Sequence, residues 1–406
     1  DQDPAPRARA EAADMQAMID AEGNVAAHTG GNCIIAAGHQ VGDQYSVQAN
    51  LMEKDTVWGA MARAYENAEG DLAENLRVMN RAMVHRGPDE EGVHVEPGLG
   101  AGLAVRRLSI VDPETGSQPL FNEDRTIAVV CNGEIYNHRE LRRELQQKGY
   151  RFRGRSDCEV LPHLYQEEGA AFLERLNGMF ALAVLDARRR TLLLARDRVG
   201  MKHLYWASTD QGIVFASEAR SLFAVGLVQP MPDWSRLGAY FTVGWIQSPG
   251  TAYEGLNRLR PGSFVEVGEH GIREGRFWIP RFQQADPSRR DETWSEELKE
   301  LLEKAVASHL EADFPAGLFL SGGWDSSLIG LYASRLQEAP LQSYSLVFPD
   351  DPDSDESSFF RAVVRQVGAV SEEIEVRDAD IRDVLVETAL ALEEPNVSCP
   401  TTLGYL

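Results

Sequence analysis

Apolar residues between positions 99 and 220 gather in short runs that polar turns separate, a pattern typical of β-strands. Helical spacing of apolar residues predicts a helix over 70–83, and Asn137 and Gly149 are placed to begin and end a helix at 138–148. Strands in pairs with helices outside them indicate a layered α+β domain. The clearest predicted strands are 127–131, which ends at Asn132-Gly133, 179–185 and 191–195.

From residue 293 onward, short apolar runs alternate with amphipathic stretches. Thr293 and Glu296 have the spacing of a capping box, which predicts the start of a long helix. This helix is expected to turn five apolar side chains inward: Leu298, Leu301, Leu302, Val306 and Leu310. The alternation of strands and helices after it predicts a parallel, doubly wound sheet. The predicted order is strand 317–320, helix 326–337, strand 342–348, helix 357–367, strand 370–376 and helix 379–393.

Two segments have weaker patterns. Residues 1–56 are rich in Ala, Gly, Asp and Gln and show little periodicity, so we interpret them as a loosely structured extension. Residues 230–290 hold Pro, Gly and Trp in short strands and turns, which indicates a linker with some structure of its own.

Composition narrows the class of protein. The chain is 43% apolar and 25% charged, as in ordinary soluble globular proteins, and 406 residues are enough for two or three domains. A net charge of −23 repels phosphate backbones, so general binding to nucleic acid or to anionic membranes is not expected. The four cysteines form no CxxC pair, and no apolar run is long enough to span a bilayer. The cytoplasm is the expected compartment.

The segment Ser-Gly-Gly-Trp-Asp-Ser-Ser at 321–327 lies between a predicted strand and a predicted helix, where parallel sheets bind ligands. Gly322 and Gly323 would let the backbone approach an anion, and the free N–H groups of the helix start would point at it. Three hydroxyl groups would add donors: Ser321, Ser326 and Ser327. The pattern predicts a pyrophosphate-binding loop; a tight turn with Ser caps is the alternative.

Asp325 indicates that this loop also binds a cation. Its carboxylate would repel phosphate unless a cation lay between them, so it implies Mg²⁺. The Gly-Lys-Ser/Thr ending of a Walker loop is missing. The segment looks like the pyrophosphate loop of ATP pyrophosphatases, which form acyl-adenylates and release pyrophosphate.

A second set of polar residues lies in the first half of the chain. Arg107 could bind a carboxylate through two parallel hydrogen bonds, and Asp157 could bind an ammonium group. Asn132 and Gly133, at a predicted strand end, offer a side-chain amide and a backbone N–H, the parts of an oxyanion hole. Each has a plainer alternative: a surface ion pair for Arg107, a hairpin turn for Asn132-Gly133 and a helix cap for Asp157. Together they predict a site for a free amino acid and its amide.

Five motifs follow one another along the chain: 85–89 (His-Arg-Gly-Pro-Asp), 107–112 (Arg-Leu-Ser-Ile-Val-Asp), 132–137 (Asn-Gly-Glu-Ile-Tyr-Asn), 196–200 (Arg-Asp-Arg-Val-Gly) and 321–327. In this order they resemble the motifs of the glutamine-hydrolysing asparagine synthetases (class B), and the resemblance runs from about residue 57 to the last residue. The resemblance implies a four-layer αββα glutaminase domain of the N-terminal-nucleophile type, followed by a synthetase domain. The domain bounds expected are 1–56 extension, 57–270 glutaminase type, 271–292 linker and 293–406 incomplete synthetase.

The resemblance also implies a reaction. Such enzymes adenylate aspartate with ATP and Mg²⁺ and amidate it with ammonia from glutamine, and class membership suggests a homodimer. Glutamine would be bound by Arg107, Asn132, Gly133, Glu134 and Asp157. Leu320 and Leu346 fall where the family contacts ATP, beside the 321–327 loop, and Asp325 would be the metal residue.

Two departures from the family pattern bear on activity. The family nucleophile is an N-terminal cysteine whose α-amine serves as its base, but the matching position here is the internal Trp58. Cys33 is the only upstream cysteine, and removal of a propeptide would be needed to expose it, whereas Cys131 and Cys158 fit core or pocket-wall thiols better. The chain also stops at Leu406, before the family's second acidic metal motif, so either site could be impaired.

Two other classes of function remain open. Ring-closing or ammonia-dependent relatives, such as β-lactam synthetases and lasso-peptide cyclases, often lack the cysteine, which fits Trp58. They also tend to lose the glutamine pocket, and the presence of Arg107, Asn132 and Asp157 in this chain does not fit that loss. A degenerate glutaminase-fold module that acts in protein contacts is the third possibility, and binding of free glutamine would separate the first class from both others.

Overall fold

The structure is a computed structural model. It describes residues 15–19, 25–29, 38–42, 45–49, 72–282, 289–351 and 355–395. In the first part, β1 (Met15–Ile19) pairs with β2 (Val25–Thr29), and β3 (Gly38–Gly42) pairs with β4 (Tyr45–Ala49), both antiparallel. These two hairpins are more regular than the weak periodicity of this segment suggests.

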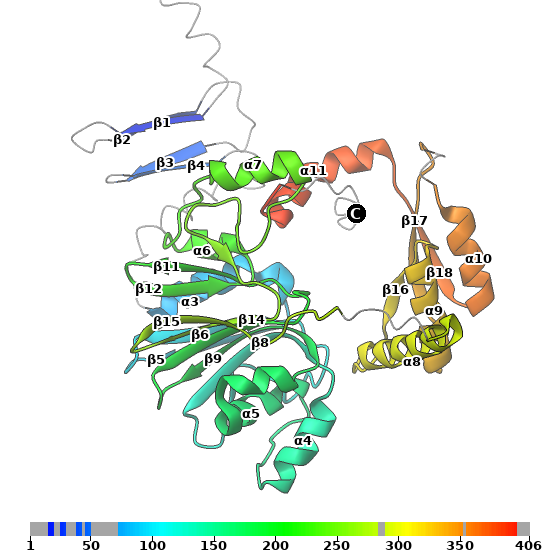
Figure 1. The fold of residues 1–406 in the computed structure, drawn as a ribbon. Coiled ribbons are helices and arrows are strands. Elements are labelled where there is room, and N and C mark those ends of the chain that lie inside the picture. The colour runs from blue at the N-terminus through cyan, green and yellow to red at the C-terminus, as the bar shows by residue number, and fades with distance from the viewer. Residues whose placement is uncertain are drawn as a thin grey trace, which may run out of the picture.

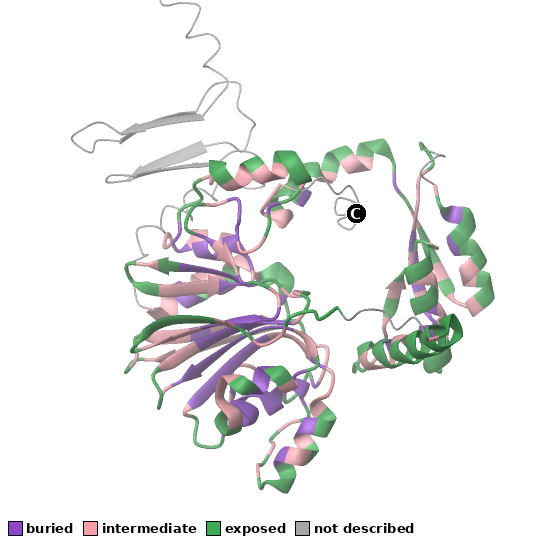
Figure 2. Cartoon of the chain, viewed as in Figure 1, coloured by how far each residue is buried: buried purple, intermediate pink, exposed green. Residues whose placement is uncertain are grey.

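A six-stranded antiparallel sheet is the centre of the first domain (Figure 1). Its strands β8 and β9 are long and almost fully buried, because small and branched apolar residues occupy both faces. Figure 2 shows this burial as purple in the middle of the sheet. In sheet order the strands are β15 (Gly271–Arg276), β14 (Ser263–Gly268), β10 (Thr191–Arg196), β9 (Gly178–Asp186), β8 (Ile127–Ile135) and β7 (Leu120–Phe121).

Shorter strands form a second layer. The pair β5 (Glu90–Glu96) and β6 (Ala101–Arg107) is antiparallel, as is the set β12 (Gly212–Ala216), β11 (Tyr205–Thr209) and β13 (Asn257–Arg258). Alternate residues of the long strands face this layer, and they form one apolar cluster with it. Its members include Leu103, Ala128, Val130, Ala181, Ala183, Leu194, Trp206 and Val265.

Helices cover both outer faces. On one side, α4 (His138–Gln147) and α5 (Val160–Glu168) pack on the other face of the long strands through residues such as Leu141, Leu164 and Phe180. On the opposite side, α3 (Leu72–Ala82) and α6 (Ala219–Ala224) cover the second layer. The predicted αββα sandwich is confirmed.

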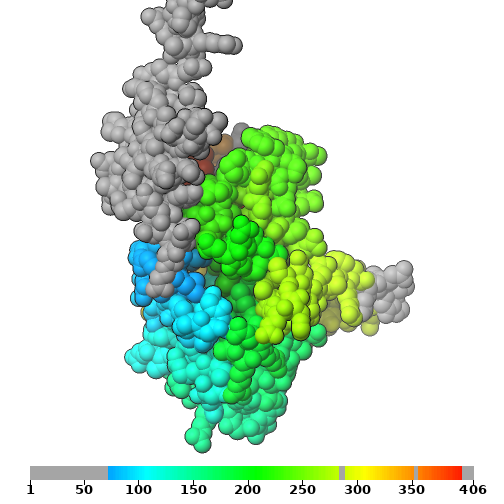
Figure 3. All heavy atoms as spheres, turned by 90° about the vertical axis from the view of Figure 1, so that its left-hand side faces the viewer, coloured from blue at the N-terminus to red at the C-terminus, as the bar shows by residue number. Residues whose placement is uncertain are grey.

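Most predicted elements of this domain are present, with two differences. The strand expected to end at Asn132-Gly133 continues through both residues to Ile135, so the pair is no hairpin turn. Residues 271–276, placed in the expected linker, form β15 at the sheet edge. In Figure 3, segments from both ends of the domain, in blue to cyan and in yellow-green, lie on one face with green segments between them.

The C-terminal part alternates strands and helices as predicted. Its three strands are parallel, in the order β16 (Gly317–Phe319), β17 (Gln342–Val347), β18 (Val370–Glu375). This order has no reversal, so the described strands do not include the switch point of a doubly wound sheet. The helices are α8 (Asp291–His309), α9 (Trp324–Leu336), α10 (Ser357–Val367) and α11 (Asp378–Leu392). A further helix, α7 (Trp234–Val243), precedes this part.

The prediction for the start of α8 was wrong in two respects. The helix begins at Asp291 after Arg290, and no side chain caps it, so the capping box of Thr293 and Glu296 does not form. Leu298 and Leu301, expected to point inward, are 56% and 59% exposed, whereas Val306 is buried. Periodicity identifies the apolar stripe of a helix, but only tertiary contacts decide how much of it is covered.

Candidate functional site

Arg107, at the end of β6, holds the loop that follows it. The guanidinium Nη2 donates to the carbonyl oxygens of Val111 at 2.7 Å and Asp112 at 2.9 Å, and Nη1 donates to the Glu90 carboxylate at 3.1 Å. The residue is 8% exposed, so it is no surface ion pair. Two of its five N–H donors stabilise the loop and one binds Glu90, so Nε and one N–H of Nη1 remain for a ligand.

Asp112 ends this loop in a buried position with a left-handed backbone, φ 52°. Its carboxylate accepts hydrogen bonds from the backbone N–H groups of Arg155, at 2.6 Å, and Ser156, at 3.0 Å, and from Thr115. Burial works against ionisation, but these hydrogen bonds outweigh it and lower the pKa of Asp112. An ionised Asp112 therefore ties the loop to the segment that carries Asp157.

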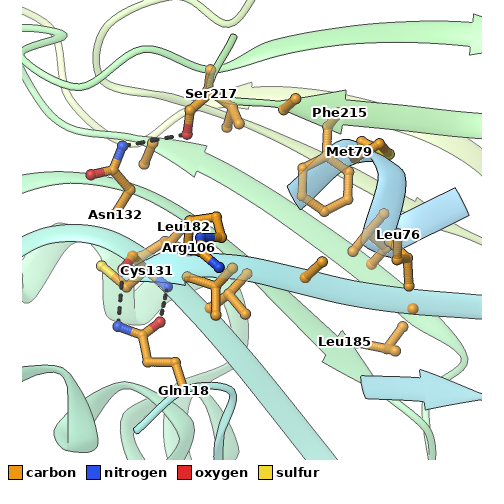
Figure 4. Close-up of a pocket in the computed structure, with 18 of the residues that line it drawn as sticks. Leu76, Met79, Arg106, Gln118, Cys131, Asn132, Leu182, Leu185, Phe215 and Ser217 are labelled. Atoms are coloured by element: carbon orange, nitrogen blue, oxygen red, sulfur yellow. Dashed lines mark hydrogen bonds between the residues drawn. The ribbon is translucent and has the colours of Figure 1, made fainter. Parts of the chain in front are cut away.

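Asn132 and Gly133 lie side by side in β8. The Asn132 amide donates to the Ser217 hydroxyl at 3.3 Å, as Figure 4 shows. Gly133 has φ 146°, and a Cβ atom there would lie 1.9 Å from the carbonyl oxygen of Met179. Only glycine fits this position in the strand, and its neighbour presents an amide to the adjoining cavity.

Glu134 and Asp157 form an acidic pair at the same place. The Asp157 carboxylate accepts the backbone N–H of Ile135 at 2.7 Å, so Asp157 joins η3 (Asp157–Glu159) to β8 and caps no helix. Burial, followed by the charge of Asp157 and a hydrogen bond to it, raises the pKa of Glu134 from its ordinary 4.5 to about 8. The pair therefore holds a proton at neutral pH, and a bound cationic group could take the place of that proton.

Cys131 and Cys158 line the wall beneath these residues. Both are free thiols, 4% and 2% exposed, which confirms their predicted role as pocket-wall thiols. The side chain of Gln118 exchanges two hydrogen bonds with the backbone of Cys131, at 2.8 and 3.0 Å (Figure 4). A hydrogen bond with Cys131, together with burial, raises the pKa of the Cys158 thiol, so it stays protonated.

One cavity of about 1090 Å³ joins these residues. The five residues predicted to bind glutamine all line it: Arg107, Asn132, Gly133, Glu134 and Asp157. At the other end, Leu76, Met79, Leu185 and Phe215 make its wall apolar (Figure 4). The structure thus brings together side chains that lie 50 residues apart in the sequence, at a polar end of a half-apolar cavity.

The motif 196–200 has a structural role. The Arg196 guanidinium donates to the carbonyl oxygens of Gly200, Lys202 and Leu259, at 2.5 to 2.8 Å. The fully buried Asp197 carboxylate accepts N–H groups of Phe180 and of residues 199 to 202. Together they shape the turn that places Lys202 on the cavity.

The segment 321–327 follows β16 and leads into α9, as predicted, and its residues 324–327 form the first turn of that helix. Ser321 Oγ lies 3.1 Å from Ser326 Oγ and accepts the N–H of Gly323 at 3.3 Å. Ser327 donates its N–H to the carbonyl of Gly323 at 3.0 Å, which closes the first turn of α9. Gly322 has φ 85°, and a Cβ atom there would lie 2.4 Å from the nitrogen of Phe360.

The residues around this loop differ in accessibility. Leu320 is buried and bonded to β17, through its N–H to Tyr344 and its carbonyl to the Ser345 hydroxyl. Leu346 lies on β17, half-buried. Asp325 is exposed in the first turn of α9. No group of three or more His, Cys, Asp or Glu side chains among the described residues could hold a metal ion by itself.

Several residues of the site carried no signal in the sequence. Ser217 and Gln118 lie far from Asn132 and Cys131 along the chain, and nothing in their surroundings marks them. Glu90, which pairs with Arg107, sits on a different strand. Trp58 and Cys33, the two positions weighed for the nucleophile, lie outside the described residues.

Comparison with known proteins agrees with this geometry. The family model described as "Glutamine amidotransferase domain" matches residues 57–278, more than half of the chain. The chain belongs to the glutamine amidotransferase family. This match covers the four-layer domain and its cavity, and a second model, "Asparagine synthase", matches residues 297–405, over the C-terminal part.

Similar proteins carry both parts. "Asparagine synthetase [glutamine-hydrolyzing]" from Zea mays is 38% identical over 66% of this amidotransferase chain and 40% of its own length. "Asparagine synthetase B [glutamine-hydrolyzing]" from Escherichia coli (strain K12) is 35% identical over 78% of this chain and 54% of its own. The chain thus spans about half the length of these curated relatives.

A solved glutamine phosphoribosylpyrophosphate amidotransferase from B. subtilis, in complex with ADP and GMP, is 17% identical over 73% of this chain and 63% of its own, with a TM-score of 0.37. A likeness this weak supports no conclusion. Within the part of the chain that the structure describes, no helix is both long and apolar enough to cross a membrane.

Proposed function

We propose that this chain carries the glutamine site and the ATP site of an asparagine synthetase-type ligase, which amidates aspartate through an acyl-adenylate with ammonia from glutamine. The observation that carries the proposal is the convergence of the five predicted glutamine ligands on one cavity, in a chain whose second part matches the asparagine synthase family. Such an enzyme would act in the cytoplasm, and a homodimer is its expected form.

In the glutamine site, charge decides the pose of the ligand. The remaining N–H groups of Arg107 would bind the α-carboxylate, and the Glu134–Asp157 pair would bind the α-ammonium in exchange for its proton. The side-chain amide would then extend toward Asn132, whose Nδ2 is held by Ser217, and toward Gly133. These two would stabilise the oxyanion that forms on attack at the amide carbon.

In the ATP site, the 321–327 loop would bind the phosphates. The hydroxyl groups of Ser321, Ser326 and Ser327 and the N–H groups at the start of α9 would be the donors to a bound anion. Leu320 and Leu346 would bound the nucleotide. Asp325 would hold Mg²⁺, which usually takes only one or two carboxylates and completes its shell with phosphates and water, so an exposed lone Asp fits this role. The ion would neutralise phosphate charge.

Release of glutamate from glutamine by the purified chain tests the proposal, with glutamine binding measured by calorimetry and the intact mass read in parallel. Glutamate release that disappears in Cys33→Ala, from a chain whose mass begins at Cys33, would establish a processed glutaminase. Binding without release would mean a glutamine pocket that lacks its nucleophile, with free ammonia as the nitrogen source. Failure to bind glutamine would refute the proposal.

The lining of one cavity by all five predicted glutamine ligands disfavours a ring-closing ligase. Aspartate-dependent exchange between ATP and pyrophosphate, measured in a full-length version, separates the two classes. Exchange that requires a different carboxylate would favour the ring-closing class.

A further inference from the structure

Residues from the C-terminal part contact the loop that Arg107 organises. Asp313, between α8 and β16, accepts the backbone N–H of Asp112 with its Oδ2 at 2.8 Å. Its own N–H donates to the carbonyl oxygen of Ile110 at 3.1 Å. Two hydrogen bonds in opposite directions therefore join segments that are 201 positions apart in the sequence.

Neighbouring residues of the same segment face the glutamine site as well. The rings of Tyr136 and His309 lie 4.4 Å apart, and the Glu311 carboxylate lies 3.4 Å from Arg139 Nε and 3.7 Å from His138 Nε2. A small cavity of about 130 Å³ lies between the two parts, and its wall includes Glu134 and Asp157. The contact thus adjoins the acidic pair.

Asp112 connects this contact to the binding residues. Its carbonyl oxygen accepts from Arg107, and its carboxylate holds the N–H of Ser156, the residue before Asp157. Its own left-handed backbone, φ 52°, is uncommon for a residue other than glycine and persists only where surrounding bonds maintain it. Asp313 accepts the backbone N–H of Asp112 itself. This hydrogen bond therefore supports the residue of the loop whose backbone conformation is least favourable.

We propose that Asp313 is a positioning residue for the glutamine site: it holds the loop 107–112 in the conformation that aligns Arg107 and Asp157. The affinity of the amidotransferase domain for glutamine then depends on a side chain of the C-terminal part. By linkage, bound glutamine strengthens the docking of that part on the loop by the same factor. This inference rests on the proposed function, since it assumes that glutamine occupies the cavity.

Asp313→Ala removes the acceptor, while the backbone bond to Ile110 stays. Asp313 is exposed, so truncation leaves no buried hole and folding is preserved. Calorimetry should show about tenfold weaker glutamine binding, the lower end of the scale of one lost hydrogen bond to a charged group. Asp313→Asn keeps an acceptor oxygen and should restore affinity to within about twofold of the parent. The matched control is Glu303→Ala, which removes an exposed carboxylate of α8 outside this contact, and it should bind glutamine as the parent does.

Two further readouts separate positioning from general damage. Binding of inorganic pyrophosphate to the 321–327 loop should be the same in Asp313→Ala and in the parent. Hydrogen exchange in the ligand-free chain should quicken at the backbone amides of Asp112 and Ser156 in Asp313→Ala only. Unchanged exchange and unchanged glutamine affinity would overturn the inference. If the parent itself fails to bind glutamine, the proposed function and the affinity claim both fall, whereas the exchange result still decides whether Asp313 orders the loop.

Discussion

At the scale of single residues, the site is built from groups whose usual properties are altered by their neighbours. Glu134 is a carboxylic acid that keeps its proton near neutral pH, because it is buried beside Asp157. Gly133 is a strand residue with a backbone that only glycine adopts readily. Each alteration leads to a measurable consequence.

We expect glutamine to bind more tightly as the pH rises toward 8. The positive α-ammonium of glutamine favours the ionised form of Glu134. At a pH below the raised pKa of Glu134, about 8, glutamine binding must therefore release the proton that Glu134 holds. The dissociation constant should fall by up to about tenfold per pH unit between pH 6 and 8 and level off above. Calorimetry in buffers of different ionisation enthalpy measures the released proton. Glu134→Gln serves as the control, and a dissociation constant that is flat in the parent would contradict the assignment.

The same pair sets a trend in stability. Because the folded state keeps a proton that the unfolded state loses above pH 4.5, the free energy of unfolding should fall as the pH rises from 4.5 toward 8. This contribution is complete at low pH and lost above the raised pKa, and Glu134→Gln should remove it.

Gly133→Ala should destabilise the amidotransferase domain strongly. A Cβ atom 1.9 Å from the Met179 carbonyl forces β8 and β9 apart, and φ 146° is strained for alanine. We expect a loss of about 3 kcal/mol or more in the free energy of unfolding, measured by chemical denaturation. Gly98→Ala is the matched control, since its nearest atom would lie 3.7 Å away, and it should change stability by less than about 0.5 kcal/mol. Equal effects would show that the strand accommodates a side chain.

At the scale of elements, strand ends and helix starts place the chemistry. A short loop joins the end of β16 to the start of α9, and its two glycines have different roles. Gly322 has a left-handed backbone and packs against α10, whereas Gly323 has φ −66°, and a Cβ atom there would lie 3.5 Å from the Ser321 hydroxyl oxygen, an ordinary contact distance. Sequence alone presents them as an equivalent pair.

We therefore expect the two glycines to respond differently to alanine. Gly322→Ala should lower the free energy of unfolding by about 2 kcal/mol and abolish nucleotide binding, because a Cβ atom 2.4 Å from the Phe360 nitrogen reshapes the loop. Gly323→Ala should cost less than about 1 kcal/mol, yet still weaken pyrophosphate binding if the backbone there approaches the anion. Denaturation and pyrophosphate titration check both. Two variants with the same stability would contradict this division of roles.

At the scale of the whole molecule, the described residues of the C-terminal part contact the layered domain around Asp313 and around Glu393. The second contact follows α11, which passes above the layered domain in Figure 1. The Glu393 carboxylate accepts the N–H groups of Ala219 and Arg220 at 2.7 Å each, and its carbonyl accepts the Tyr253 hydroxyl at 2.5 Å. Burial raises the pKa of Glu393, although these N–H groups oppose the shift.

Glu393→Ala should loosen this contact. It leaves two backbone N–H groups at the start of α6 without their acceptor, which costs about 1–3 kcal/mol of stability. Thermal unfolding and limited proteolysis between residues 276 and 291 measure the effect. Glu387→Ala, on the exposed side of α11, is the control and should behave as the parent. An unchanged Glu393→Ala variant would mean that the contact contributes nothing to the arrangement of the two parts.

The sequence by itself determined most of the local structure and the class of chemistry. Periodicity predicted α3, β9, β10 and every strand and helix after β16, because the apolar residues of each segment have the spacing or the short run typical of its own type of element. Motif order identified the residues that line the cavity, since Arg107, Asn132 and Asp157 belong to short stretches with a recognisable composition.

Tertiary structure alone decided how these pieces act on one another. Ser217 accepts a hydrogen bond from Asn132, and Asp313 accepts one from Asp112. Glu134 keeps a proton because it is buried and because Asp157 lies beside it. The exposure of Leu298 and Leu301, and the continuation of β8 through Gly133, have the same origin. Such properties depend on distances between segments far apart in the chain, and a local pattern of residue types carries no information about those distances.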